Sequence, residues 1–239
     1  MSPDDDAADR RARVVLAGHR GDASTVSGAL GDPAPVVRSA ALGGAARLGL
    51  LDPLTLRDGL EDAHPDVRSR ACRLAAALPG PLGPALQSLV DRLDDPDDRV
   101  TEVACFACGE RADLDARGVD RLVELSGDHT DALVRESAVA ALGSLAGLGV
   151  VDRIGRTDSV RAAVVAAGSD VAPVRRRVAV ATAAFDGPEV ERLLDRLLTD
   201  RDQQARQIAE DLRAISGGTA SGPEEQPVAW VDRRRDPTD

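Results

Sequence analysis

The stretch Asp62-Ala63-His64-Pro65-Asp66-Val67-Arg68 joins an acidic turn to the start of an apolar helix, and it recurs along the chain of 239 residues. Pro suits the first turn of a helix, where its missing N–H is not needed, and an Asp side chain accepts the free N–H groups there. The same phrase runs from Asp32 to Arg38 and from Asp128 to Arg135. Weaker copies run from Asp95 to Thr101, from Asp170 to Arg175 and from Asp200 to Arg206.

The spacing of these copies predicts the fold. Aligned on the Val-Arg step, successive copies lie 30, 33, 34, 40 and 31 residues apart. Periods of about 20–50 residues are typical of stacked two-helix units, each of which buries its apolar face only against its neighbours. We therefore predict an all-α fold, a right-handed α-α superhelix of about six helix pairs with an N-terminal capping helix. The expected pairs are 22–31 with 35–48, 53–61 with 65–78, 82–93 with 97–110, 116–126 with 131–146, 157–168 with 171–185, and 188–199 with 201–215.

Two columns of the aligned second helices support this prediction. Three residues after the Arg column stand small residues: Ala41, Ala71, Ala104, Ala138, Val178 and Ala209. One residue further, five units are apolar (Leu42, Cys72, Cys105, Val139 and Ala179) and the last has Glu210. Small residues permit close helix contact, and a polar closing unit is expected where the end of a stack meets water.

The expected domain plan is one solenoid over residues 7–215. Residues 1–6 are acidic, and residues 216–239 lack an apolar period, so we expect both ends to be disordered. The linker 148–154 is longer than the others and has room for an extra helical turn.

Composition limits the classes of function. A net charge of −11 opposes non-specific attraction to nucleic acid or to anionic membranes. No apolar run approaches the length of a membrane span, and the acidic N-terminus does not resemble a signal peptide. With three cysteines at expected core positions, these features predict a cytoplasmic protein with reduced thiols. The absence of Lys, Asn and Tyr suggests codon bias in a GC-rich bacterial genome.

The Asp-Pro-x-x-Val-Arg turn, the Ala-rich second helix and the period near 30 residues resemble HEAT repeats, in particular the phycobilisome-lyase-like variety. The resemblance covers about residues 10–215. For function it implies a wide range, because such repeats occur in scaffolds, lyase subunits, a di-iron hydroxylase and DNA-binding repair proteins.

Arg38, Arg68, Arg135, Arg175 and Arg206 form a column in the alignment. One interpretation is a ladder of Asp–Arg pairs that fixes the turns and links neighbouring units. The other is a row of guanidinium groups that binds phosphate or carboxylate ligands. We favour the ladder, because Thr101 interrupts the column and a continuous phosphate track would tolerate such a break poorly.

The presumed inner surface carries charges of both signs. Arg70 and Arg73 lie on one second helix, Arg175-Arg176-Arg177 on another, and Glu102 and Glu136 on the helices between them. Nucleic-acid binding favours a continuous basic stripe, whereas a partner protein with patches of both signs suits a mixed surface. The alternative interpretation is that these charged residues are simply solvated and bind no partner.

Catalytic and metal-binding patterns are weak. Cys105-Phe106-Ala107-Cys108 is a C-x-x-C pattern, but Cys72 aligns with Cys105, so core packing is the favoured interpretation. None of the three histidines, His19, His64 and His129, precedes a Glu, whereas the di-iron hydroxylases of the family use His-Glu pairs as ligands. We expect no metal, no cofactor and no enzymatic activity.

Aromatic residues are few. Phe106 and Phe185 are expected in the core, which disfavours base stacking on the solenoid. Trp230 lies in an apolar cluster before three arginines and is either part of a disordered tail or the anchor of a docking motif.

The sequence therefore predicts a non-catalytic scaffold that binds a partner protein on the concave surface of the second helices. The candidate contact residues are Arg70, Arg73, Glu102, Glu136, Arg176, Arg177 and Trp230. The alternatives are a lyase- or hydroxylase-like enzyme subunit and a DNA-binding relative, with nucleic acid and membranes the less favoured partners.

Overall fold

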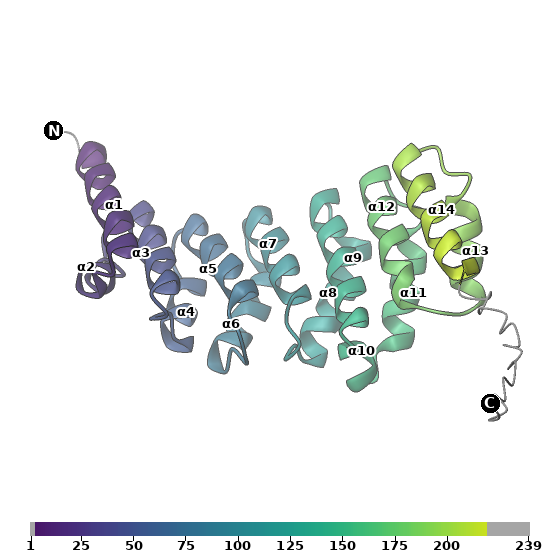
Figure 1. The fold of residues 1–239 in the computed structure, drawn as a ribbon, viewed down its shortest axis with the longest axis horizontal. Helices are drawn as coiled ribbons and strands as arrows, with labels where there is room; N and C mark the ends of the chain where they lie inside the picture. The colour runs from purple at the N-terminus through teal and green to yellow at the C-terminus, as the bar shows by residue number, and fades with distance from the viewer. Residues whose placement is uncertain (1–2, 219–239) are drawn as a thin grey trace, which may run out of the picture.

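A computed structural model describes residues 3–218, and residues 1–2 and 219–239 lie outside the described part. Within residues 3–218 the chain forms fourteen α-helices and two short 3₁₀ helices, and no strand. The helices stack along one axis as an elongated solenoid, so the two ends of the described chain lie at opposite ends of the molecule (Figure 1). The predicted all-α solenoid is confirmed.

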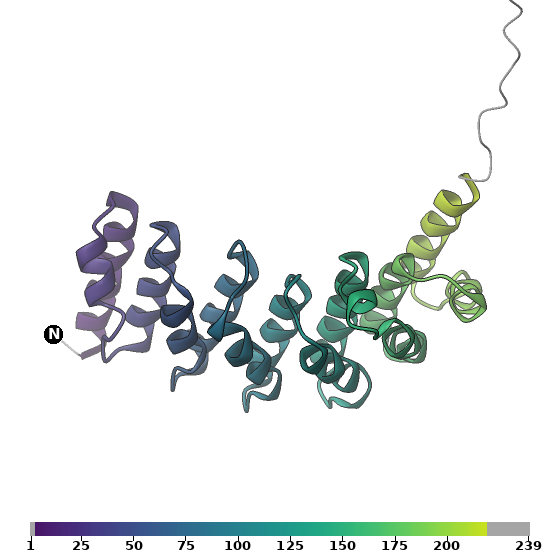
Figure 2. The ribbon, with the colours of Figure 1, turned by 90° about the horizontal axis from the view of Figure 1, so that it is seen from below.

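The solenoid has two layers. In the first, each helix packs against the next along the stack: α1 (Pro3–Arg20), α3 (Pro35–Arg47), α5 (Pro65–Ala77), α7 (Asp98–Gly109), α9 (Ala132–Gly147), α12 (Ala172–Ala181) and α14 (Gln203–Gly218). The stack is curved, and this layer lies on its concave side (Figure 2). We call these seven the inner helices.

The second layer covers the convex side. It contains α2 (Ala23–Gly28), α4 (Pro53–Leu60), α6 (Pro84–Asp91), α8 (Ala116–Asp128), α11 (Thr157–Ala167) and α13 (Pro188–Leu197). The 3₁₀ helices η1 (Arg92–Asp94) and η2 (Thr182–Ala184) extend α6 and α12, and α10 (Val150–Arg153) is the extra turn in the long linker. No helix of residues 3–218 is long and apolar enough to cross a membrane.

The helix starts follow from local chemistry. Pro65 occupies the first turn of α5, and the Asp52 carboxylate at the start of α4 accepts the N–H of Thr55 at 2.7 Å. Asp115 caps α8 in the same way through Gly118 at 2.9 Å. These caps satisfy backbone donors that have no partner inside the helix.

The core lies between the two layers, and the two columns of the alignment fall where the sequence predicts. All six residues of the small-residue column (Ala41, Ala71, Ala104, Ala138, Val178 and Ala209) are fully buried. The next column is buried through Ala179, whereas Glu210 on the last helix is exposed. Small side chains therefore let the inner helices approach one another, and the stack ends with a polar face.

Some helix bounds differ from the expectation. The first helix was expected to begin at residue 7, but α1 begins at Pro3, so Pro3–Asp6 are helical. At Asp6 this is explained by an ion pair with Arg10 one turn later. The last helix continues to Gly218, and the rest of the expected tail lies outside the described residues.

A ladder of Arg–Asp pairs joins consecutive units along the turn edge. The Arg38 guanidinium donates two bonds of 2.7 Å to Asp62 in the next turn, and its Nη1 donates to the carbonyls of Asp32 and Pro33 in its own turn. Three other arginines bind the aspartate of the next turn with the same fork: Arg68 to Asp95, Arg135 to Asp170 and Arg175 to Asp200. The predicted bracing role of this column is confirmed.

The ladder extends further than the sequence indicates, because Arg10 on α1 donates the same fork to Asp32. At the other end Arg206 binds only the carbonyl of Asp200 in its own turn, since no unit follows α14 in the described chain. The ladder therefore runs from α1 to the last described turn.

The interruption at Thr101 is matched by a second change that the sequence alignment missed. We aligned Asp128 with the ladder aspartates, but the ladder position is occupied by His129, whose Nδ1 accepts the Asp131 N–H and whose carbonyl accepts from Arg135. Thr101 keeps one bond, from its hydroxyl to the Asp95 carbonyl. Both charged residues of this rung are thus replaced, the arginine by Thr101 and the aspartate by His129. The replacement therefore leaves neither an arginine nor an aspartate without its ion-pair partner.

Candidate binding surface on the inner helices

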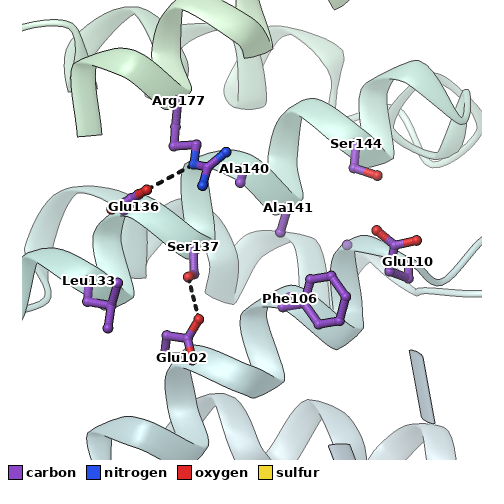
Figure 3. Close-up of a pocket in the computed structure, with 11 residues that line it drawn as sticks. Glu102, Phe106, Glu110, Leu133, Glu136, Ser137, Ala140, Ala141, Ser144 and Arg177 are labelled. Carbon is purple, nitrogen blue, oxygen red and sulfur yellow. Dashed lines mark hydrogen bonds and ion pairs between the residues drawn. The ribbon is translucent and has the colours of Figure 1, made fainter. Parts of the chain in front are cut away.

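Hollows lie between neighbouring inner helices on the concave side. One hollow of about 410 Å³ lies between α7 and α9 and is closed at one side by Arg177 of α12 (Figure 3). Its walls are mainly apolar, with Phe106 and Leu133 on opposite sides and Ala140 and Ala141 at the back.

Two interactions between helices order the polar groups of this hollow. The Ser137 hydroxyl of α9 donates to Glu102 of α7 at 3.0 Å, and Arg177 donates to Glu136 at 2.9 Å (Figure 3). Glu110 also lines the hollow, and its carboxylate forms no hydrogen bond or ion pair among the described residues. The predicted residues Glu102, Glu136 and Arg177 are therefore brought together at one site.

The hollow continues toward the C-terminal end of the stack. A second hollow of about 360 Å³ shares Ala140, Ser144 and Arg177 with the first and adds Val180 of α12. A third, of about 450 Å³, shares Val180 and Arg177 and reaches Ile208 of α14. The three hollows share wall residues and lie in a row across α7, α9, α12 and α14. We call this row the apolar groove.

Exposed apolar side chains mark this groove. Phe106, Leu133 and Val180 are 49%, 53% and 53% exposed, although each is large enough to be expected in a core. The prediction that Phe106 is buried was wrong, because the core of α7 is filled by Cys105 and Cys108 and Phe106 lies on the adjacent face. Phe185 is buried, as predicted.

The arginine triplet of α12 is not a free basic patch. Arg175 belongs to the ladder, Arg176 donates two bonds to Asp202 at 2.9 and 2.6 Å, and Arg177 is paired with Glu136. The hydrogen bond from Arg176 holds the pKa of Asp202 well below its usual range. Arg177 is exposed and Arg175 and Arg176 are half-buried, and the following turn and α9 supply a carboxylate for each.

Unpaired positive charge lies instead at the N-terminal end of the concave surface. A separate hollow of about 310 Å³ is lined by Arg11 of α1, Arg47 of α3 and Arg70 of α5. Arg73 lies one turn beyond Arg70 and is exposed. The sequence identified Arg70 and Arg73 but missed Arg11 and Arg47, which lie outside the aligned phrase. We call these four residues the arginine cluster.

The cysteines and histidines serve the fold. Cys72, Cys105 and Cys108 are free thiols in the core, and burial raises the pKa of the Cys72 thiol to about 12. His64 caps α5 by accepting the N–H of Asp66. No group of three His, Cys, Asp or Glu side chains within residues 3–218 is arranged to hold a metal ion. Trp230 lies outside the described residues.

A family model of HEAT repeats matches residues 53–143, which contain α4 to α9 without the last turns of α9. This part of the chain consists of HEAT repeats, and the same two-layer stack continues on both sides of it. Among curated proteins, none matches the sequence significantly.

Solved structures with the same fold are armadillo- and HEAT-like repeat proteins. An engineered protein from the Northeast Structural Genomics Consortium is 20% identical with a TM-score of 0.60, and the match covers 82% of this chain and 97% of that one. A designed armadillo repeat protein in complex with the peptide (KR)4 is 18% identical with a TM-score of 0.58, over 79% of this chain and 97% of that one. YibA of Escherichia coli is 18% identical with a TM-score of 0.59, over 83% and 73%.

Proposed function

We propose that this HEAT-repeat chain is a non-catalytic scaffold that binds an extended segment of a partner protein in the apolar groove. The observation that carries the proposal is the row of adjoining hollows over four inner helices, with Phe106, Leu133 and Val180 exposed along it. Neighbouring helices pack about 8–10 Å apart, so four helices span about 25–30 Å. This length accommodates about eight or nine residues of extended chain.

The chemistry of the groove suits a peptide. Its exposed apolar side chains can cover apolar side chains of the partner. This burial stabilises the complex by about 25 cal/mol for each Å² of apolar surface removed from water. The polar groups along it are held by Ser137–Glu102 and Arg177–Glu136 bonds, so they are in place before a partner arrives. Such preorganised polar groups at the edge of an apolar centre are typical of specific interfaces.

The designed armadillo repeat protein that shares the fold has a peptide, (KR)4, in its complex. This supports a peptide as the class of ligand for a solenoid of this shape. A protein partner is also favoured over nucleic acid, because Glu102, Glu110 and Glu136 along the groove repel a phosphate backbone. The three free, buried cysteines support a location in the cytoplasm.

The test is a selection of random twelve-residue peptides displayed on phage against the full chain. We expect selected peptides to bind with micromolar affinity and to lose at least about tenfold in affinity with Phe106→Ala, because removing a buried aromatic anchor costs about 2 kcal/mol or more. The matched control is Leu54→Ala, which removes a side chain 55% exposed on α4 of the convex layer.

Two outcomes reject the proposal. One is a selection that yields no peptide above background. The other is a set of peptides whose affinity falls equally with Leu54→Ala and with Phe106→Ala, since binding would then not depend on the apolar groove.

A further inference from the structure

Most arginines of residues 3–218 have a carboxylate partner, but the four of the arginine cluster have none among the described residues. The hollow between Arg11, Arg47 and Arg70 contains no acidic side chain, and its remaining lining is Ser39 and small or apolar residues. The four cations of this cluster lie together on one surface of a chain whose net charge is −11.

Glycines on the neighbouring helix leave room for two of these side chains. A Cβ at Gly43 of α3 would lie 2.4 Å from Nη2 of Arg70, so the Arg70 guanidinium rests directly on the α3 backbone. A Cβ at Gly18 of α1 would lie 3.3 Å from Nη1 of Arg47. Each arginine therefore leans toward the N-terminal end, across the preceding inner helix, and this brings the guanidinium groups of α3 and α5 toward the same hollow.

The crowding is unfavourable without a ligand. Partial burial lowers the pKa of Arg70 from its ordinary value, and the charges of Arg73 and Arg47 lower it further. Like charges held together in a partly desolvated place attract an anion, because the anion removes their mutual repulsion and supplies hydrogen-bond acceptors.

The cluster and the apolar groove lie on the same concave side, on successive inner helices. From α5 to α9 is two helix spacings, about 16–20 Å, or about five or six residues of extended chain. One peptide can therefore reach both sites. Phosphate backbones fit less well, because a nucleic acid leaving the cluster along the groove meets Glu102, Glu110 and Glu136.

We propose that the arginine cluster binds Asp or Glu side chains of the partner segment, so that the partner is a peptide with an acidic block about five or six residues from an apolar block. This inference rests on the proposed function, since it names the partner of the same concave surface. It also distinguishes the chain from the structural neighbour that holds a basic peptide, (KR)4.

The test uses rhodamine-labelled octaglutamate and fluorescence anisotropy with the full chain, at about 50 and 200 mM salt. Octalysine and an eight-nucleotide single-stranded oligothymidine are the comparison probes. The cluster variant is Arg47→Gln with Arg70→Gln. The matched control is Arg192→Gln with Arg196→Gln, which removes the same charge from two arginines of α13 that form no ion pair among the described residues. Circular dichroism verifies that both variants are folded.

We expect octaglutamate to bind more tightly than either other probe. Its Kd is expected to rise at least about tenfold in the cluster variant, as the loss of charge-assisted hydrogen bonds implies, and less than about twofold in the control. Equal losses in the two variants would overturn the inference. Tighter binding of oligothymidine with the same dependence on Arg47 and Arg70 would also overturn it, in favour of a nucleic-acid site.

The outcomes separate this inference from the proposed function. If selected peptides still depend on Phe106 but octaglutamate binding does not depend on the cluster, only the acidic-partner inference fails. If octaglutamate binds through the cluster but no peptide depends on Phe106, the cluster is supported and the groove proposal fails.

Discussion

Arginine has different roles on the turn edge and on the concave side of this solenoid, and helix α5 contains an example of each. Its arginine on the turn edge is paired with a carboxylate, whereas one on the concave side is unpaired. Arg68 on the turn edge binds Asp95 through two bonds of 2.7 Å and the carbonyls of its own turn through Nη1. Arg70, two residues later, has no carboxylate partner and lies over Gly43 beside Arg47 and Arg73. Residue type alone therefore does not distinguish a brace from a binding group.

The difference is explained by what the next unit supplies. Except at the rung of Thr101 and His129, each turn places an aspartate opposite the preceding arginine on the turn edge. The same aspartate accepts a backbone N–H of its own turn, as Asp62 does from His64. The four arginines of the arginine cluster form no ion pair with a carboxylate among residues 3–218. Neutralised arginines hold units together, and arginines left without acids are available to a partner.

The largest expected effect is at the buried rung of the ladder. We predict that Arg68→Ala lowers the free energy of unfolding by about 3 kcal/mol, because the Asp95 side chain is fully buried and would lose its main partner. The loss is at the lower end for a buried pair, since Arg92 still reaches Asp95 at 3.3 Å. Urea unfolding followed by circular dichroism measures it.

Arg70→Ala in the same helix is the control for this prediction. It should change the free energy of unfolding by no more than about 0.5 kcal/mol, as expected of a surface side chain without a partner. Equal losses in the two variants would show that the ladder does not distinguish the turn edge from the concave side.

The next largest effect on the free energy of unfolding is expected at the rung where Thr101 and His129 replace the Arg–Asp pair. Thr101→Arg alone places a cation in a buried position without a carboxylate, and His129→Asp alone adds an acid without its cation. We predict that both single variants are destabilised and that the double variant recovers, with a coupling energy of about 1–3 kcal/mol from a double-mutant cycle. Additive effects would contradict the interpretation of these two residues as one replaced rung.

The dependence of the free energy of unfolding on pH provides a third test of the Arg–Asp pairs on the turn edge. The hydrogen bond from Arg135 lowers the pKa of Asp170, so the folded protein binds this proton less readily than the unfolded chain does. The stabilisation is complete above the unfolded value of about 3.9 and is lost as the pH falls through the folded value. Asp170→Asn should therefore cost about 1–2 kcal/mol at pH 7, and the difference from wild type should shrink as the pH falls below about 4.

Unfolding measured at intervals from pH 7 to pH 2 checks this prediction. A difference between wild type and Asp170→Asn that stays constant over the whole range would contradict an ionised Asp170 as the partner of Arg135.

The smallest effect on the free energy of unfolding is expected from a substitution on the concave side. Gly43→Ala should raise the free energy of unfolding by up to about 0.5–1 kcal/mol, because Gly is less favourable than Ala inside a helix and the Arg70 side chain is free to move away. The same variant should weaken octaglutamate binding, since it displaces the Arg70 guanidinium from its place. A variant that is more stable and binds octaglutamate unchanged would contradict the proposed position of Arg70.

The repeat phrase was sufficient to predict the fold because one physical requirement is repeated in each unit. Every inner helix needs an ordered turn before it and a small residue where it meets its neighbour, so Asp32, Ala41 and their counterparts recur at fixed offsets. The start of α1 was harder to predict, because it lacks the repeat phrase and its first residues are polar. Arg10 was missed as a ladder member for the same reason, since no copy of the phrase surrounds it.

The binding surface was less predictable, because the partner of a side chain is a property of the neighbouring unit. Arg176 and Arg177 have the sequence pattern of a basic patch, but Asp202 and Glu136 neutralise them. Phe106 is a large aromatic residue of the kind that usually lies in a core, but it lies on the exposed face of α7, next to the buried cysteines. Arg47 carried no signal in the alignment, and only its position over Gly18 places it with the cluster.

The most direct test of the account is carboxyl footprinting of the chain with and without a peptide from the selection. Carbodiimide and glycine ethyl ester label exposed carboxylates, and Glu110 in the apolar groove and Glu189 on α13 of the convex layer supply the comparison. We predict that the peptide reduces labelling of Glu110 several-fold and leaves Glu189 unchanged. Unchanged labelling of Glu110 at saturating peptide, or protection of Glu189 instead, would contradict binding on the concave side.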